Sequence, residues 1–318
     1  MYKKELHTAP MMGYSDYTFR MLMRILSPSG LLYTPMIVDR ALINNHELIR
    51  QEVSGPVILQ LGGGSPETLA AATKLVPSDR YVAVNLNVGC PSHRVQQANM
   101  GACLMKDPTF VAELFDAMQS ATALPVTIKC RLGIDDLCRY ETFYQFIETL
   151  NAAGCQSFVV HARSAWLQGI NPKKNRTIPP LQYDWVYQIK QAFPSVKIII
   201  NGGVGLENWS RNMQQTDGVM LGRLCVDNPY AIHQIAHAMD TRMPLQSRGE
   251  LLERYLDVLE KEGLMISHNH LRHVVNLFNG IAYGKQWKRF LSTSKPCKED
   301  IVDFTNDLFP TEETISVD

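Results

Sequence analysis

Eight short apolar runs recur along the first 221 residues of this 318-residue chain, separated by longer amphipathic stretches. This alternation is typical of repeated βα units around a parallel sheet. The runs cover residues 6–10, 31–37, 57–61, 81–88, 126–132, 157–162, 197–201 and 218–221. Eight such units predict an α/β fold, the (β/α)8 or TIM barrel.

The apolar runs stop after about residue 239, and a short linker over residues 241–245 follows. Helical periodicity then returns over residues 247–262, 270–278 and 298–308. We therefore expect two domains, a catalytic TIM barrel over residues 1–240 and an all-helical domain over residues 241–318. The last residues, 310–318, are expected to form a loose acidic tail.

The charges of the chain balance, with 31 basic and 31 acidic residues, and balance alone argues against a nucleic-acid partner. Their distribution argues for one, because no Asp or Glu occurs over residues 149–183 or 263–298. Such segments are either a local binding surface for phosphates or a chance clustering on a solvated face. Their basic residues are Arg163, Lys173, Lys174, Arg176, Arg272, Lys285, Lys288, Arg289, Lys295 and Lys298.

Seven cysteines are scattered along the chain without a Cys-x-x-Cys pair, which suggests neither a disulfide framework nor a zinc site. His233 and His237 have helical spacing but lack the Glu of a zinc-protease motif, so we interpret them as an exposed helix face. His268, His270 and His273 are interpreted as RNA-facing or solvated. No metal is expected.

The N-terminal residues carry no apolar signal segment, and no apolar run is long enough to span a bilayer. These features favour a cytoplasmic protein without a membrane partner.

Polar residues and glycines gather where the predicted strands end. In a TIM barrel the active site is built from the carboxyl ends of the strands and the loops after them. The residues at these ends are Pro10, Met11, Met12, Gln60, Asn85, Asn87, Cys90, Lys129, Arg131, His161, Arg163, Asn201, Gly202, Gly203, Gly222 and Arg223. One mouth of the barrel is therefore expected to collect nearly all of them.

Two glycine-rich turns, Asn201-Gly202-Gly203 and Gly222-Arg223, end the seventh and eighth runs, where barrels commonly bind phosphate. Either turn alone is routine, but together they favour a phosphorylated ligand. Lys129, His161 and Gln60 suit contacts to a flavin ring. No Gly-x-Gly-x-x-Gly follows the first run, so a mononucleotide fits better than a dinucleotide.

Cys90 lies in a Gly-Cys-Pro turn that leaves the fourth run, between Asn87 and Ser92. A cysteine is more often buried and inert, but a place at a strand end favours a chemical role. Cys130 lacks such a setting, because it follows Lys129 directly and strand alternation points it to the other face.

Several motifs together resemble those of tRNA-dihydrouridine synthases, from residue 8 to about residue 230. They are Ala-Pro-Met-Met at 9–12, Gln-Leu-Gly-Gly at 60–63, Asn-Leu-Asn-Val-Gly-Cys-Pro-Ser at 85–92, Lys129 to Arg131, Val-His-Ala-Arg at 160–163, Asn-Gly-Gly at 201–203 and Asp-Gly-Val-Met-Leu-Gly-Arg at 217–223. The loop over residues 161–181 is similar to that of the bacterial DusA-type subfamily.

The resemblance implies an FMN-containing barrel that, with the helical domain, grips tRNA. The implied reaction reduces the C5–C6 bond of a D-loop uridine, at position 20 or 20a, with NADPH or NADH as reductant and Cys90 as general acid. No obligate protein partner is implied. The implied FMN contacts are Pro10, Met11, Met12, Gln60, Lys129, His161, Asn201, Gly202, Gly203, Gly222 and Arg223. The implied tRNA contacts are Asn87, Lys173, Lys174, Arg176, Lys285, Lys288 and Arg289.

The chain departs from the family pattern in places. Pro35 stands where relatives usually have glutamate, and Ala83 replaces an acid shortly before Asn85. Around Lys285 lysine replaces arginine, which loses bidentate recognition of phosphate or base.

Two other functions are compatible with these residues. One is a flavoenzyme that acts on a free pyrimidine, which leaves the basic helical segment unexplained. The other is a tRNA-binding chaperone without catalytic activity, which needs no flavin.

Overall fold

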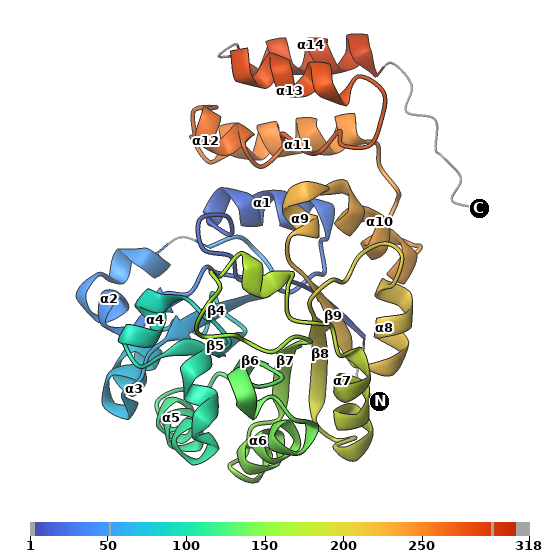
Figure 1. Cartoon of the computed structure of the whole chain (residues 1–318). Helices are drawn as coiled ribbons and strands as arrows, with labels where there is room; N and C mark the ends of the chain where they lie inside the picture. The colour runs from blue at the N-terminus through green and yellow to red at the C-terminus, as the bar shows by residue number, and fades with distance from the viewer. Residues whose placement is uncertain (1–3, 51, 294–295, 310–318) are drawn as a thin grey trace.

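The computed structural model describes residues 4–50, 52–293 and 296–309 (Figure 1). The expected acidic tail over residues 310–318 lies outside these ranges. A parallel sheet forms the centre of the molecule. Its strands are β1 (Glu5–Thr8), β2 (Leu32–Tyr33), β3 (Ile37–Val38), β4 (Val57–Gly62), β5 (Ala83–Val88), β6 (Val126–Arg131), β7 (Ser157–His161), β8 (Lys197–Asn201) and β9 (Gly218–Leu221).

The sheet closes into a barrel, as predicted. The strands follow the order β1-β9-β8-β7-β6-β5-β4-β2, and β3 pairs with β4 beside β2. The two ends of this order meet where the amide of Thr8 donates to the carbonyl of Leu31 at 2.9 Å and the amide of Leu31 donates to the carbonyl of Leu6 at 2.9 Å. All eight predicted runs contribute strands to it.

The second run is divided into two short strands at Pro35. The amide of Thr34 still donates to the carbonyl of Ile58, at 3.1 Å, but proline has no N–H to continue the ladder. Pairing with β4 resumes at Ile37, opposite Leu61. The departure at Pro35 therefore shapes the loop at this rim of the barrel.

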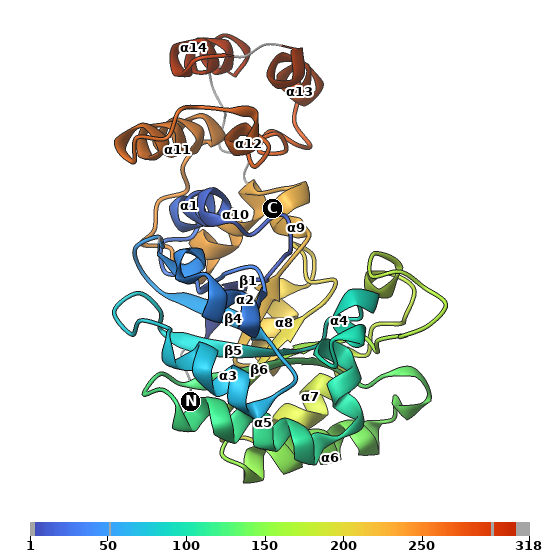
Figure 2. The ribbon, with the colours of Figure 1, turned by 90° about the vertical axis from the view of Figure 1, so that its left-hand side faces the viewer.

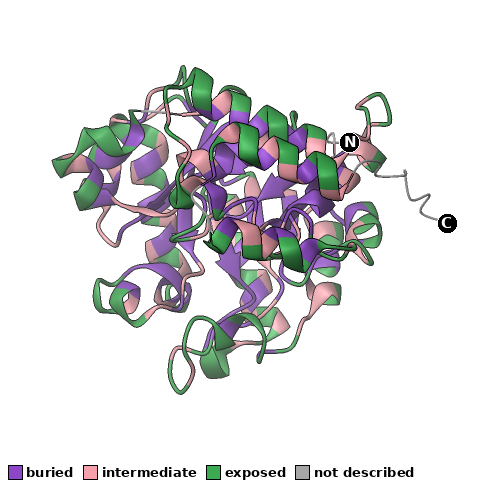
Figure 3. Cartoon of the chain, turned by 90° about the horizontal axis from the view of Figure 1, so that it is seen from above, coloured by how far each residue is buried: buried purple, intermediate pink, exposed green. Residues whose placement is uncertain are grey.

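Helices alternate with the strands and cover the barrel. Those of the barrel region are α1 (Tyr17–Leu26), α2 (Asp39–Asn44), α3 (Pro66–Lys74), α4 (His93–Gln97), α5 (Pro108–Ser120), α6 (Tyr140–Ala152), α7 (Tyr183–Ala192), α8 (Trp209–Gln215), α9 (Leu224–Asp227) and α10 (Tyr230–Met239), with short 3₁₀ helices η1 (His46–Ile49), η2 (Gly101–Lys106), η3 (Asp135–Leu137) and η4 (Lys174–Arg176). Seen from above, buried residues occupy the strands and the inner helix faces (Figure 3).

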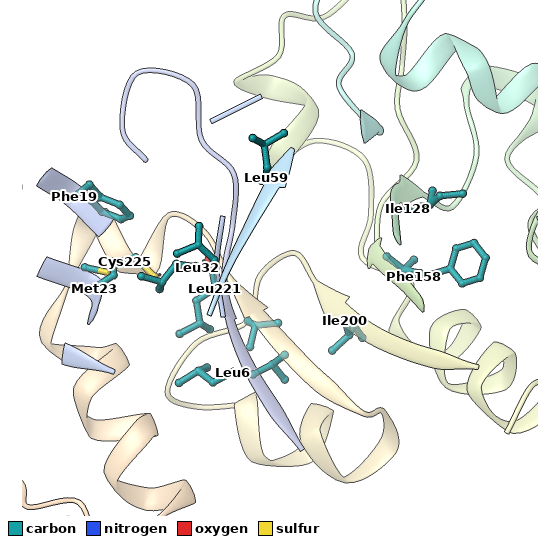
Figure 4. Close-up of a cluster of buried hydrophobic side chains, with 14 of the residues drawn as sticks. Leu6, Phe19, Met23, Leu32, Leu59, Ile128, Phe158, Ile200, Leu221 and Cys225 are labelled. Atoms are coloured by element: carbon teal, nitrogen blue, oxygen red, sulfur yellow. Dashed lines mark hydrogen bonds between the residues drawn. The ribbon is translucent and has the colours of Figure 1, made fainter. Parts of the chain in front are cut away.

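The main hydrophobic core lies between the strands and these helices. Figure 4 shows Leu6, Leu59 and Leu221 of the strands with Phe19 of α1, all members of one buried cluster. A second, smaller cluster fills the inside of the barrel, and its members are Ala9, Tyr33, Ile58, Ala83, Val159, Ile199 and Met220. Because side chains alternate along a strand, the next inward positions toward the carboxyl ends are polar and belong to the site below.

Four helices follow the barrel and stack above α1, α9 and α10 (Figures 1 and 2). They are α11 (Arg248–Lys261), α12 (His268–Leu271), α13 (Gly284–Thr293) and α14 (Lys298–Leu308). The helical composition was predicted, while the boundary at residue 240 stays a prediction. The predicted helix over residues 270–278 was wrong, because α12 ends at Leu271 and hydrogen-bonded turns continue to α13, which the periodicity missed.

The histidine interpretations were partly wrong. His233 does not lie on an exposed face, because its side chain is buried between the carbonyl of Leu26 at 3.0 Å and the amide of Gln246 at 2.9 Å. His273 is also buried, and its Nε2 lies 3.1 Å from a carboxylate oxygen of Asp16. Both histidines therefore join the helical segment to the barrel.

Two kinds of feature are absent from the described residues, a membrane-spanning helix and a cluster of metal ligands. None of the helices there is both long enough and apolar enough to cross a bilayer. Nor does that part of the chain bring together three or more His, Cys, Asp or Glu side chains that could hold a metal ion.

Candidate active site

A row of buried amide side chains crosses the carboxyl end of the barrel. Gln60 on β4 donates from Nε2 to Oδ1 of Asn85 at 2.7 Å, and Asn85 donates to the hydroxyl of Thr127 at 2.9 Å. Asn87 donates to Oε1 of Gln60 at 2.9 Å. Since buried polar groups are costly without partners, this mutual pairing fixes all four side chains. It forms the inner layer on which the mouth is built.

Asn87 also fixes the loop that carries Cys90. Its Oδ1 accepts from the amide of Gly89 at 3.2 Å and from the amide of Cys90 at 3.0 Å. The Cys90 side chain is partly exposed, whereas Cys130 is buried, and burial raises the pKa of the Cys130 thiol to about 12. Cys130 is thus buried away from solvent, and the chemical role of Cys90 stays a prediction.

Gly101 packs directly behind Cys90. Its φ is +76°, and a Cβ atom at this position would lie 2.6 Å from the Cys90 carbonyl oxygen and 3.3 Å from the Cys90 Cβ. The next amide, of Ala102, donates to the same carbonyl at 2.9 Å. Only glycine allows this approach without strain, so η2 forms a wall that positions the cysteine loop.

Lys129 and His161 occupy inward positions at the ends of β6 and β7. The ammonium of Lys129 donates to Oδ1 of Asn201 at 3.2 Å. Burial, reinforced by the charge of Arg131, lowers the pKa of Lys129 to about 8. Burial also holds the pKa of His161 well below its usual value, with Arg131 and Lys129 adding to the effect. The imidazole is therefore neutral near pH 7.

The His161 ring lies against the glycine turn after β8. A Cβ atom on Gly202 would come within 3.1 to 3.3 Å of three ring atoms. Gly202 and Gly203 both have positive φ, +101° and +65°, which suits a turn whose amides approach a ligand closely. The buried Nδ1 of His161 has no hydrogen-bond partner among the described residues. At the mouth of the barrel, an unpaired polar atom of this kind fits a site that a bound group completes.

Gly222 and Arg223 follow β9 at the same rim. Gly222 is partly buried, and the exposed Arg223 donates from its guanidinium to the carbonyl of Arg176 at 3.2 Å. This bond joins the end of β9 to the long loop after β7. The two predicted phosphate turns therefore lie at neighbouring strand ends beneath that loop.

The first strand brings Pro10, Met11 and Met12 to the rim. Pro10 and Met11 are partly buried, while Met12 is 67% exposed. The hydroxyl of Ser15 accepts from the amide of Met11 at 2.8 Å and holds the bend of this loop. Met12 is therefore solvent-exposed at the rim, and Met11 packs against both hydrophobic clusters.

Arg131 was predicted to lie at the mouth, but it was not among the implied FMN or tRNA contacts, and the structure gives it a positioning role. It is buried, and its guanidinium donates to the carbonyls of Gly89 at 2.9 Å, Ser164 at 2.8 Å and Asn175 at 2.9 Å. It thus ties the Cys90 loop to the long loop after β7. Its place two residues beyond Lys129, on the same strand face, was the available signal.

The predicted tRNA contacts separate into one buried and several exposed residues. Asn87 is 9% exposed, and its side-chain amide is already hydrogen-bonded to the Cys90 loop and to Gln60. The exposed residues on the loop after β7 are Lys173, Lys174 and Arg176. On α13, Lys285 and Arg289 are exposed and Lys288 is partly so. The loop after β7 is hydrogen-bonded to Arg223 after β9, and the segment before α13 is hydrogen-bonded to α9, which follows Arg223 in the chain.

The long loop after β7 rests on α4. Gln96 of α4 donates to the carbonyl of Leu167 at 3.2 Å, and Figure 2 shows the loop beside α4. Trp166 is 37% exposed. Its amide donates to Oδ1 of Asn175 at 2.8 Å, and its carbonyl accepts from Nδ2 of Asn175 at 2.8 Å. The basic residues of the loop therefore project from an ordered frame.

Ala83, the second departure from the family pattern, lies inside the barrel below the amide row. It is buried with Tyr33 and Ile58 in the smaller apolar cluster. An apolar side chain fits this layer, and the neighbouring amide row is complete without an acid at position 83.

Solved structures with the same barrel fold include two reductases. A complex of 2-naphthoyl-CoA reductase has a TM-score of 0.54 at 10% identity and covers 74% of this chain and 50% of its own. Morphinone reductase has a TM-score of 0.51 at 12% identity and covers 77% and 87%. At such low identity the likeness shows the fold alone.

Sequence comparison identifies nearer relatives. A protein of Xanthomonas campestris pv. campestris, named tRNA-dihydrouridine(20/20a) synthase, is 43% identical over 297 residues, covering 90% of this chain and 87% of the relative. A Synechocystis protein with the same name is 44% identical over 299 residues, covering 91% and 89%. The family model described as dihydrouridine synthase (Dus) matches residues 7–309. The chain therefore belongs to the dihydrouridine synthase family.

Proposed function

We propose that this protein reduces the C5–C6 bond of a D-loop uridine in tRNA to dihydrouridine, at position 20 or 20a, with FMN as cofactor and NADPH or NADH as reductant. The names of the two relatives support the substrate and its positions. The single observation that supports the chemistry is the setting of Cys90. Its side chain is partly exposed, and its amide donates to Asn87 at the end of β5, in the mouth that Lys129 and His161 also line.

The residues of the mouth fit FMN. The turn at Gly202 and Gly203 offers backbone amides to a phosphate, and Lys129 supplies a positive charge close to it. The unpaired Nδ1 of His161 is available to the bound group. In this proposal Pro10, Met11, Met12, Gln60, Asn201, Gly222 and Arg223 complete the contacts to FMN.

FMN held at this turn and reduced by NADPH or NADH would supply the hydride that C6 of the uracil receives. Cys90 donates its thiol proton to C5, so that hydride and proton together add the two hydrogens of dihydrouridine. The thiolate then recovers a proton from solvent. Asn87 and Gly101 hold the loop in place during this transfer, and Lys129 adds positive charge beside the site.

A uridine inside folded tRNA must leave its stack to reach this mouth. Residues Lys173, Lys174 and Arg176 on one side, and Lys285, Lys288 and Arg289 on the other, supply phosphate contacts in the proposal. Both groups are exposed or partly exposed, and phosphate contacts dominate the affinity of most nucleic-acid binding.

The test is to purify the protein, record its visible absorbance, and supply tRNA from a strain that lacks dihydrouridine. We expect a flavin spectrum and dihydrouridine at position 20 or 20a. Reduction of free uracil with indifference to tRNA would instead establish a free-pyrimidine enzyme. Tight tRNA binding without flavin absorbance would establish the chaperone function.

A further inference from the structure

Tyr283 combines two unusual properties. Its φ is +64°, in the left-handed region, which only two other non-glycine residues of the described chain adopt, Asn99 and Asp135. Asn and Asp tolerate this conformation, but for a bulky aromatic residue it is an outlier. Its side chain is also 56% exposed. The tyrosine is therefore strained and recovers little of that cost by burial, a combination that marks functional positions.

The turn around Tyr283 is imposed by its neighbours. Gly284 is buried so close to the backbone that a Cβ atom there would lie 2.4 Å from the carbonyl oxygen of Phe278. Trp287 is fully buried and donates from Nε1 to the carbonyl of Val274 at 3.1 Å. The amide of Trp287 in turn donates to the carbonyl of Tyr283 at 3.1 Å. The packing fixes the backbone, while nothing in it requires an aromatic side chain at position 283.

This turn is docked on the rim of the active-site mouth. Asn276 donates to the carbonyl of Val226 at 2.9 Å, and Asn279 donates to the carbonyl of Asp227 at 2.9 Å. Both carbonyls belong to α9 or its end, and α9 begins directly after Arg223 at the end of β9. Figure 2 shows the segment between α12 and α13 above α9. The segment that leads to Tyr283 therefore lies against α9, the helix that begins after the end of β9.

The surroundings of Tyr283 are cationic. Lys285, Lys288 and Arg289 follow on the first turns of α13, within the acid-free segment over residues 263–298. Within the described ranges, no carboxylate forms an ion pair with Lys285 or Arg289. An exposed aromatic ring among unpaired cations suits a partner that offers both planar rings and negative charge, as an unpaired stretch of RNA does.

We propose that Tyr283 stacks on an unpaired nucleobase of the bound tRNA, on the helical side of the mouth. The ring face selects a base without reading its sequence, while the neighbouring basic residues contact the flanking phosphates. This inference rests on the proposed function for the identity of the RNA. It adds a contact that acts on affinity and not on the chemical step.

The experiment compares Tyr283→Gly, Tyr283→Phe and Tyr283→Asn for tRNA affinity at several salt concentrations and for thermal unfolding. Stacking on one base accounts for about 5- to 160-fold in affinity, so we expect the Gly and Asn variants to bind that much more weakly. The Phe variant should bind like the parent. Because the Gly variant relieves the strained φ, it should also unfold at a higher temperature.

The salt dependence separates stacking from charge. The Gly variant should keep the parent's slope of affinity against salt, since no phosphate contact is removed. Val82→Ala, which alters a side chain 43% exposed just before β5, is the distant control and should bind tRNA like the parent.

Unchanged tRNA affinity in the Gly and Asn variants would overturn the proposal, as would an equal loss in the Phe variant. A parent protein that binds tRNA through Tyr283 but forms no dihydrouridine would contradict the proposed function alone. The two proposals are therefore tested separately.

Discussion

Replacing Gly101 by alanine tests how closely Cys90 is positioned by the wall behind it. The added Cβ would lie 2.5 Å from Cγ1 of Val95 and 2.6 Å from the carbonyl oxygen of Cys90. Both distances are far below van der Waals contact, so either the cysteine loop or η2 must shift. The carbonyl also accepts the amide of Ala102, and a shift weakens that bond.

The expected cost has two parts. An L-residue in the left-handed region loses about 1–2 kcal/mol, and overpacking a tight contact adds about 1–3 kcal/mol. Gly263→Ala is the matched control, because Gly263 has a φ of +70° but no atom within 4 Å of an added Cβ. The control should therefore show only the first part, about 1–2 kcal/mol.

The assay measures denaturant unfolding and the rate of dihydrouridine formation at saturating tRNA for both variants. We expect Gly101→Ala to lose about 2–5 kcal/mol of stability and about 100-fold in rate, since a displacement near 1 Å at a reacting group has that effect. Gly263→Ala should keep the parent rate. A normal rate in a stably folded Gly101→Ala protein would refute the positioning role.

Three further predictions concern charge. Lys173→Ala with Lys174→Ala should weaken tRNA binding and reduce its salt slope by about 1 per lysine. The control Lys74→Ala, at an exposed lysine of α3, should change neither. An unchanged slope in the double variant would count against the loop contacts. Because burial and Arg131 lower the pKa of Lys129 to about 8, FMN affinity of the flavin-free protein should decline as pH rises through that value, and titrations of Lys129→Met should lack this decline. Burial opposes ionisation of Asp16, but hydrogen bonds from His273 and the Phe19 amide lower its pKa overall. Its contribution to stability is then present above about pH 4 and lost as pH falls. Asp16→Asn should therefore flatten the acid side of a plot of unfolding free energy against pH.

The barrel was predictable because its signal is local and repeated. Buried parallel strands need nearly continuous apolar runs, and every run found in the sequence became a strand. The division of the second run at Pro35 was also readable, since proline cannot donate to a ladder. The predicted helix over residues 270–278 was wrong because residues 272–283 pair their backbone groups largely within turns packed on α9, which periodicity does not encode.

The site was predictable as a set of strand ends and not as a network. Cys90, Lys129 and His161 do gather in one mouth, as the fold requires. The sequence could not show that Arg131 joins the Cys90 loop to the loop after β7, because its three acceptors are backbone carbonyls far apart in the chain. His273 was interpreted as solvated for the same reason, because its partner Asp16 is 257 residues away in the sequence.

The most direct test of the account is the rate of dihydrouridine formation by Cys90→Ala, measured by mapping position 20 and 20a of tRNA. Cys138→Ala, at another partly exposed cysteine, serves as the control. General acid catalysis accounts for about 100- to 10,000-fold, so we predict a loss of that size in Cys90→Ala with flavin content and tRNA affinity unchanged. Full dihydrouridine formation by Cys90→Ala would contradict the assignment of Cys90 as the proton donor.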